Sequence, residues 1–73
     1  MTLQEKINLI EEIMDLDEGV LTPSDVLADW EEWDSLSTLA LTVEMNQRFQ
    51  IKLTTDKIKS FQTVQDICDI IPD

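Results

Sequence analysis

Residues 34–49 read DSLSTLALTVEMNQRF, and their apolar side chains recur with the spacing of a helix. Asp34 is one of the residue types that cap a helix start, and Ser35 is tolerated in the first turn. At about 100° per residue, the apolar residues divide into two opposite faces instead of one stripe. We predict a helix over Ser35–Phe49, and its two faces determine how the rest of the chain can fold around it.

So short a chain has difficulty covering both faces. The first face, which we expect to join the core, consists of Leu41, Met45 and Phe49, flanked by Thr38 and Thr42. The second face, here called the outward patch, consists of Leu36, Leu39, Ala40 and Val43. Between them runs a polar strip of Ser37, Glu44 and Arg48, the last two with the spacing of an ion pair. Because 73 residues offer few segments to enclose one helix, we expect the outward patch to be exposed; the alternative is that it is more core.

The chain before this helix is expected to hold one further helix and a long loop. Residues 2–5 (TLQE) have the spacing of a capping box, and an apolar stripe follows them as far as Leu16 or Asp17. Glu11 falls on the opposite, polar face of that helix. The connection over residues 17–34 is long for a helical bundle, so it should contain a short turn of its own.

The chain after the central helix is expected to form two more helices. Thr54 or Thr55 can cap a short helix that continues to residue 58 or 59, and Thr63 can start a last helix that Pro72 stops. The inward side of that last helix consists of Val64, Ile67, Cys68 and Ile71. The sequence therefore predicts one all-α domain over residues 1–73, a bundle of three main helices and one short helix with a long loop between the first two.

Composition excludes several classes of function. Sixteen acids against five bases give a net charge of −11, which disfavours nucleic acid and anionic membranes and favours partners with basic patches. There is no histidine and only one cysteine, so the usual zinc ligand sets and Cys–His or Ser–His pairs are absent. We predict no catalytic residue. No apolar run is long enough to span a membrane and the start does not resemble a leader, so we expect a cytoplasmic protein.

A calcium loop is the one metal site that the spacing of acids suggests. Asp15, Asp17 and Gly19 resemble the start of such a loop, but the glycine stands one place early. Val26 also occupies the position that the closing glutamate would need. We therefore predict no metal site.

The residues at the start of the central helix allow two interpretations. In the first, Asp34 is the N-cap and Ser35 has only a structural role. In the second, the free N–H groups and the positive end of the helix dipole suit a phosphate attached covalently to Ser35. The spacing alone leaves both open.

The run D-S-L at residues 34–36 resembles the modification site of the acyl and peptidyl carrier proteins. The similarity continues through Leu39, Leu41, Val43, Met45, Phe49, Ile51, Leu53, Phe61 and the ending TVQDICDII at 63–71. It implies a four-helix carrier fold with a 4′-phosphopantetheine arm on Ser35, between Asp34 and Leu36. A phosphopantetheinyl transferase would install the arm from coenzyme A, and the arm's thiol would hold acyl or aminoacyl groups as thioesters. The chain is then a carrier and not an enzyme.

The resemblance also implies where partner enzymes dock. The expected docking residues are Leu36, Leu39, Ala40, Val43, Trp33 and Glu44. The expected partners are the transferase and a loading ligase, synthase or transferase with a basic docking patch. We expect the carrier itself to be a monomer.

This chain departs from the carriers of fatty-acid synthesis around the serine. Those carriers usually have glycine before D-S-L, where this chain has Glu32 and Trp33, and a proline where it has Thr54. Their second helix has acids where this chain has Ala40, Asn46 and Gln47. Here the acids lie ahead of the serine, at Asp29, Glu31, Glu32 and Asp34. These differences favour a specialised free-standing carrier for a secondary-metabolite, aminoacyl or cell-surface pathway.

Two other functions remain to be separated from this one. The first is a small acidic helical interaction module that uses the outward patch and has no covalent arm. The second is an acidic mimic of nucleic acid, which the long apolar gaps between acids disfavour. The carrier and the interaction module differ at Ser35, because only the carrier requires a modified hydroxyl.

Overall fold

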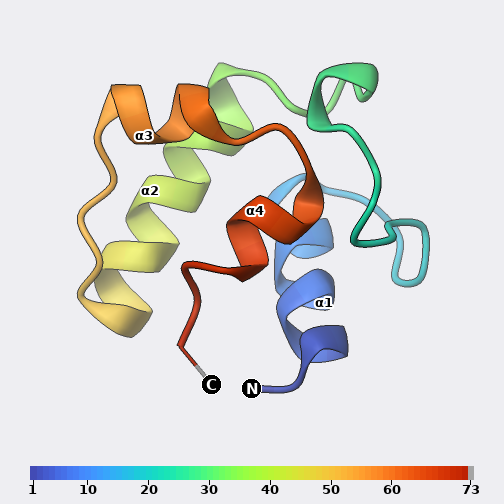
Figure 1. Cartoon of the computed structure of the whole chain (residues 1–73), viewed down its shortest axis with the longest axis horizontal. Coiled ribbons are helices and arrows are strands. Elements are labelled where there is room, and N and C mark those ends of the chain that lie inside the picture. Colours follow the sequence, from blue (N-terminus) through green and yellow to red (C-terminus); the bar gives the residue numbers. More distant parts are fainter. Residues whose placement is uncertain (73) are drawn as a thin grey trace.

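The computed structural model describes residues 1–72, which form four α-helices and one turn of 3₁₀-helix without a sheet (Figure 1). The predicted all-α fold is confirmed. The helices are α1 (Leu3–Ile13), α2 (Ser35–Phe49), α3 (Thr55–Ser60) and α4 (Val64–Cys68), and the 3₁₀ turn covers Leu27–Asp29 in the long loop. The predicted bounds of α2 are correct at both ends. The last helix was expected to continue up to Pro72, but it ends at Cys68. Hydrogen-bonded turns follow it as far as Ile71.

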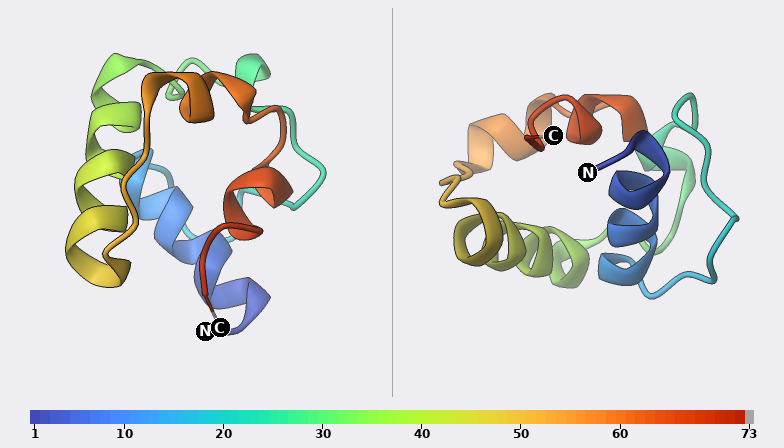
Figure 2. Two further views of the ribbon diagram at one scale, coloured as in Figure 1. Left: turned by 60° about the vertical axis from the view of Figure 1, so that its left-hand side comes forward. Right: turned by 90° about the horizontal axis from the view of Figure 1, so that it is seen from below.

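The bundle has two layers. Seen from below in Figure 2, α1 and α2 lie in one layer, and the segment that carries α3 and α4 crosses over them. α3 lies near the start of α2, because the chain after α2 runs back along it (Figure 1). Within residues 1–72, no helix is long and apolar enough to cross a membrane.

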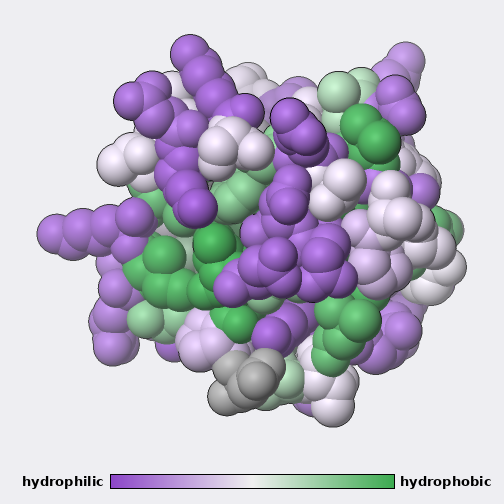
Figure 3. Space-filling model, viewed as in Figure 1, coloured by the Kyte–Doolittle hydropathy of each residue, from purple (hydrophilic) through white to green (hydrophobic). Residues whose placement is uncertain are grey.

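The core lies where α1, α2 and α4 meet. Its fully enclosed side chains include both Leu41 and Met45 of the predicted inner face of α2. The other buried apolar residues are Ile7, Leu9, Ile10, Met14, Leu21, Leu27, Phe61, Val64, Ile67, Cys68 and Ile71. Further apolar side chains are half-buried at the edge of this core, and Figure 3 shows apolar residues gathered between the C-terminal half of α2 and α4. Burial raises the pKa of the Cys68 thiol, so at neutral pH this side chain packs as a small apolar group.

Side-chain caps start the helices where the sequence predicts them. Thr2 and Glu5 form a reciprocal capping box on α1, and the Thr2 N–H lowers the pKa of Glu5. Thr63 and Asp66 form the same box on α4. The N–H groups of Gln62 and Thr63 donate to the Asp66 carboxylate at 2.9 and 3.0 Å and lower its pKa. These local bonds explain why helices as short as α4 begin at a defined residue.

The end of α1 differs from the prediction of Leu16 or Asp17. The helix ends at Ile13, because Asp15 has a left-handed backbone with φ of 59°. The N–H of Leu16 then reaches back to the carbonyl of Glu11 at 2.8 Å, and that of Asp15 to Glu12 at 3.1 Å. These are the bonds of a Schellman motif, in which glycine usually takes the left-handed position. Aspartate takes it here, so the stop was not visible in the sequence.

Glu11 is not on an exposed polar face, and that prediction is wrong. Its side chain is 1% exposed. Its Oε2 accepts the backbone N–H groups of Gly19 and Leu21, both at 2.9 Å, while its Oε1 has no partner within the described residues. The carboxylate therefore anchors the long loop to α1, since these two donors would otherwise lack a protein acceptor.

The long loop is also joined to the start of α4. The N–H of Gln65 donates to the carbonyl of Pro23 at 2.9 Å, and that of Val64 to Asp25 at 3.1 Å. The N–H of Leu27 donates to the carbonyl of Gln62 at 2.9 Å. These bonds hold the long loop against the start of α4, shortly before the chain reaches Ser35.

Candidate functional site

The start of α2 is built by Asp34. Its Oδ1 accepts the N–H groups of Leu36 and Ser37, both at 3.0 Å, and Ser37 Oγ accepts the N–H of Asp34 at 2.9 Å. This is a reciprocal capping box, with serine in the place that glutamate or glutamine usually holds. Asp34 is therefore the N-cap, as the sequence predicts, and it fixes the position of Ser35 in the first turn.

Ser37 is the residue of this box that the sequence misplaces. It is predicted in a polar strip with Glu44 and Arg48, but it is 5% exposed. Its hydroxyl also donates to the carbonyl of Asp34 at 3.0 Å. The spacing D-x-x-S was the available signal, because the third residue after an N-cap is where the partner of a capping box stands.

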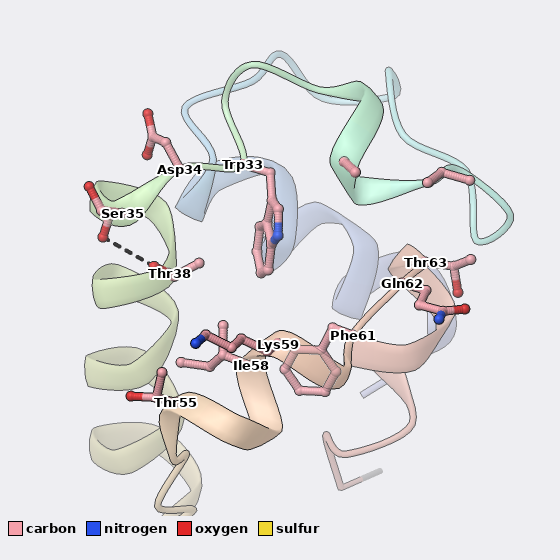
Figure 4. Close-up of a pocket in the computed structure, with 12 residues that line it drawn as sticks. Trp33, Asp34, Ser35, Thr38, Thr55, Ile58, Lys59, Phe61, Gln62 and Thr63 are labelled. Atoms are coloured by element: carbon pink, nitrogen blue, oxygen red, sulfur yellow. Dashed lines mark hydrogen bonds between the residues drawn. The ribbon is translucent and has the colours of Figure 1, made fainter.

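Ser35 presents a free hydroxyl at the surface. The residue is exposed, and its side chain makes no hydrogen bond within residues 1–72. Its backbone carbonyl accepts the hydroxyl of Thr38 at 3.2 Å (Figure 4). Such a hydroxyl is accessible to an enzyme that modifies it.

The expectation of several free N–H groups beside Ser35 is wrong. The carboxylate of Asp34 already accepts the donors of Leu36 and Ser37, and Thr38 donates to the carbonyl of Asp34 at 3.0 Å. An anion on Ser35 would therefore meet a carboxylate at the helix start and few unused donors. This competition between the cap and a phosphate for the same donors was not visible in the sequence.

A cavity of about 690 Å³ opens beside Ser35, between the start of α2, α3 and the long loop (Figure 4). We call it the Ser35 cavity. Trp33 hangs into it from the loop, and Ile58 and Phe61 form its apolar wall on the α3 side. Its lining consists of Val26, Ala28, Trp33, Asp34, Ser35, Thr38, Thr55, Ile58, Lys59, Phe61, Gln62 and Thr63. The sequence pattern does not predict this cavity, because its walls come from separate segments of the chain.

The outward patch is exposed, as predicted. Leu36 is 76% exposed, Leu39 62% and Val43 43%, while Ala40 is half-buried. The alternative that these residues are more core is therefore excluded. They lie on the helix that begins at Ser35, so the patch adjoins the candidate site.

The other two expected docking residues have different surroundings. Trp33 is half-buried, packs against the core and lines the Ser35 cavity. Glu44 is half-buried and forms the predicted ion pair with Arg48. Docking roles for both residues stay predictions. Within residues 1–72, no group of three or more acidic, histidine or cysteine side chains is placed to hold a metal ion.

Comparison with known proteins identifies similar chains. Residues 7–71 match the family described as the phosphopantetheine attachment site. An acyl carrier protein of Thermobifida fusca (strain YX) is 30% identical over 63 residues, which cover 86% of this chain and 80% of that protein. No solved structure matches this chain.

Proposed function

This chain belongs to the phosphopantetheine attachment-site family of carrier proteins, and we propose that Ser35 bears its arm. As a carrier it is not itself an enzyme, and its cofactor is 4′-phosphopantetheine. The attached arm supplies a thiol that forms thioesters with acyl or aminoacyl groups. The observation that carries the assignment to Ser35 is its exposed hydroxyl without a hydrogen bond, in the capped first turn of α2 and beside a cavity.

The residues around Ser35 fit an attached arm. Asp34 holds the first turn of α2, so the backbone of Ser35 is held in place before an incoming transferase. Leu36 follows it with an apolar side chain that is 76% exposed. The Ser35 cavity offers about 690 Å³ of space directly beside the attachment point. Cys68 is buried, so it does not compete with the arm's thiol for cargo.

The outward patch supports docking of partner enzymes beside the arm. Carriers of this family work with phosphopantetheinyl transferases and acyl-processing enzymes. Leu36, Leu39 and Val43 expose apolar side chains on the helix that begins at Ser35, which suits a transient contact. The net charge of −11 favours partners with basic docking patches, and a monomer that docks transiently fits this charge.

The specialised pathway is a further part of this proposal. It rests on Trp33, which lines the cavity one residue before the capping aspartate, and on the acids ahead of Ser35. We place the carrier in a secondary-metabolite, aminoacyl or cell-surface pathway. A cytoplasmic location is part of the same prediction.

Mass spectrometry tests the assignment of Ser35. The purified chain is incubated with coenzyme A, magnesium and a broad-specificity transferase, alongside Ser35→Ala and the matched control Ser24→Ala. We expect the mass of one phosphopantetheine to be added to the wild type and to Ser24→Ala, and none to Ser35→Ala. No gain on the wild type would favour the interaction module without an arm. A gain that survives Ser35→Ala would place the arm elsewhere.

A further inference from the structure

An arm on Ser35 brings a negative charge to a place that already has one. This step rests on the proposed function, which attaches the arm through a phosphodiester. Asp34 lies next to Ser35 in the sequence, and its carboxylate has taken the N–H groups of Leu36 and Ser37. The whole chain already carries a net charge of −11. A cation nearby would therefore stabilise the phosphodiester, since two of the donors at the helix start are already taken by Asp34.

Lys59 is the cation that the fold places on the opposite wall of the Ser35 cavity. It is the only basic residue that lines the cavity, and its amine lies on the side of α3 that faces α2 (Figure 4). It has no ion pair or hydrogen bond from its amine within residues 1–72. Two other basic residues near α3 are engaged, since Arg48 pairs with Glu44 and the amine of Lys57 lies 5.8 Å from the ring centre of Phe61.

The charges of the chain are also unevenly distributed. Four of the five basic residues and only one of the sixteen acids lie between Arg48 and Lys59. The segment that includes α3 is thus positive in a strongly negative molecule. An anion attached at Ser35 is drawn toward this segment and away from the acids ahead of the serine.

We propose that Lys59 binds the phosphodiester that joins the arm to Ser35, and so links α3 to the start of α2. α3 is the helix whose stability such a link would increase most. None of its six residues is buried, and it packs through half-buried Ile58 and the following Phe61. Attaching the arm therefore stabilises α3, and the chain with its arm differs from the bare chain in this helix.

The link is an exposed ion pair, so its effect is modest and falls with salt. Pairs of this kind correspond to about a two- to fivefold change in an equilibrium constant. Lys59 also lies in the last turn of α3, where a cation stabilises a helix with or without an arm. For this reason, the stability of α3 is compared between the chain with its arm and the bare chain, separately for each variant.

The experiment compares four chains with and without the arm: wild type, Lys59→Gln, Lys59→Arg and the matched control Lys52→Gln. Lys52 is an exposed lysine that precedes α3 and does not line the cavity. Coenzyme A without cargo is used for loading, and mass spectrometry first verifies the gain on Ser35. The readouts are amide hydrogen exchange of α3 and the ³¹P resonance of the phosphodiester, at low and high salt.

We expect the arm to slow exchange in α3 about two- to fivefold at low salt in the wild type, Lys59→Arg and Lys52→Gln. In Lys59→Gln this protection should be lost and the ³¹P resonance should shift. Equal protection and an unmoved resonance in Lys59→Gln would overturn the role of Lys59 while leaving the arm on Ser35 intact. A chain that gains no mass would instead contradict the proposed function itself.

Discussion

Charged side chains are usually exposed and large apolar side chains are usually buried. α1 and α2 each contain an exception to this rule, in opposite directions. α1 buries a carboxylate at Glu11, which is 1% exposed, whereas α2 exposes Leu36 and Leu39 at 76% and 62%. The buried carboxylate has its partners inside the chain, because it accepts two N–H groups of the long loop. The exposed leucines are largely uncovered by the rest of residues 1–72. The first exception therefore serves the fold, and the second leaves an apolar surface that we propose as a docking site.

The largest effect on stability is expected from a substitution on the buried face of α2, compared with the same substitution on the outward patch. Leu41→Ala removes a fully buried side chain and should lower the free energy of unfolding by about 2–5 kcal/mol. Leu39→Ala, the same change two residues earlier on the outward patch, should change it by less than about 0.5 kcal/mol. Urea unfolding followed by circular dichroism measures both. Similar losses for the two variants would mean that the faces do not differ as described.

A smaller effect is expected at the buried carboxylate of α1. Glu11→Ala leaves the N–H groups of Gly19 and Leu21 without their acceptor and should cost about 1–3 kcal/mol. The neighbouring Glu12→Ala, at an exposed position, is the control and should stay within about 0.5 kcal/mol. Hydrogen exchange at the amides of Gly19 and Leu21 should rise only in Glu11→Ala. If both variants unfolded at the same urea concentration, the anchor would not contribute to stability.

The smallest effect on stability, with the clearest effect on function, is expected at Val43. Val43 is 43% exposed, so Val43→Asp should cost less than about 1 kcal/mol and keep the helical content. It should nevertheless lower kcat/KM for arm transfer by about tenfold, because docking loses an apolar contact. Leu36→Ala should act in the same direction. Unfolding of Val43→Asp would contradict the exposed position of Val43.

The parts of the fold that rest on local bonds were predictable. The bounds of α2 follow from Asp34 and the helical pattern up to Phe49, and the start of α4 follows from Thr63. The end of α1 was not predictable, because Asp15 adopts the left-handed conformation that usually signals glycine. The burial of Glu11 depends on N–H groups of a loop eight to ten residues away, which no helical pattern encodes.

The candidate site has two parts, the start of α2 and the cavity beside it, and only the first was predictable. Ser35, its cap and the outward patch follow from the pattern of a single helix, since their placement is local. The Ser35 cavity and Lys59 were not visible, because α3 reaches the start of α2 only through the path of the chain after Phe49. The competition between Asp34 and a phosphate for the same donors was not predictable either, because it depends on where the Asp34 side chain points.

The backbone bonds between the long loop and the start of α4 have a consequence for the order of events during synthesis. Val26 and Thr63, which form an isolated backbone bridge, both line the Ser35 cavity. Residues 62–65 supply the other half of these bonds. Because these residues follow Ser35 in the sequence, the surroundings of Ser35 are completed only after residues 62–65 have been synthesised. A transferase that requires those surroundings would modify the folded domain and pass over a chain that has not yet reached these residues.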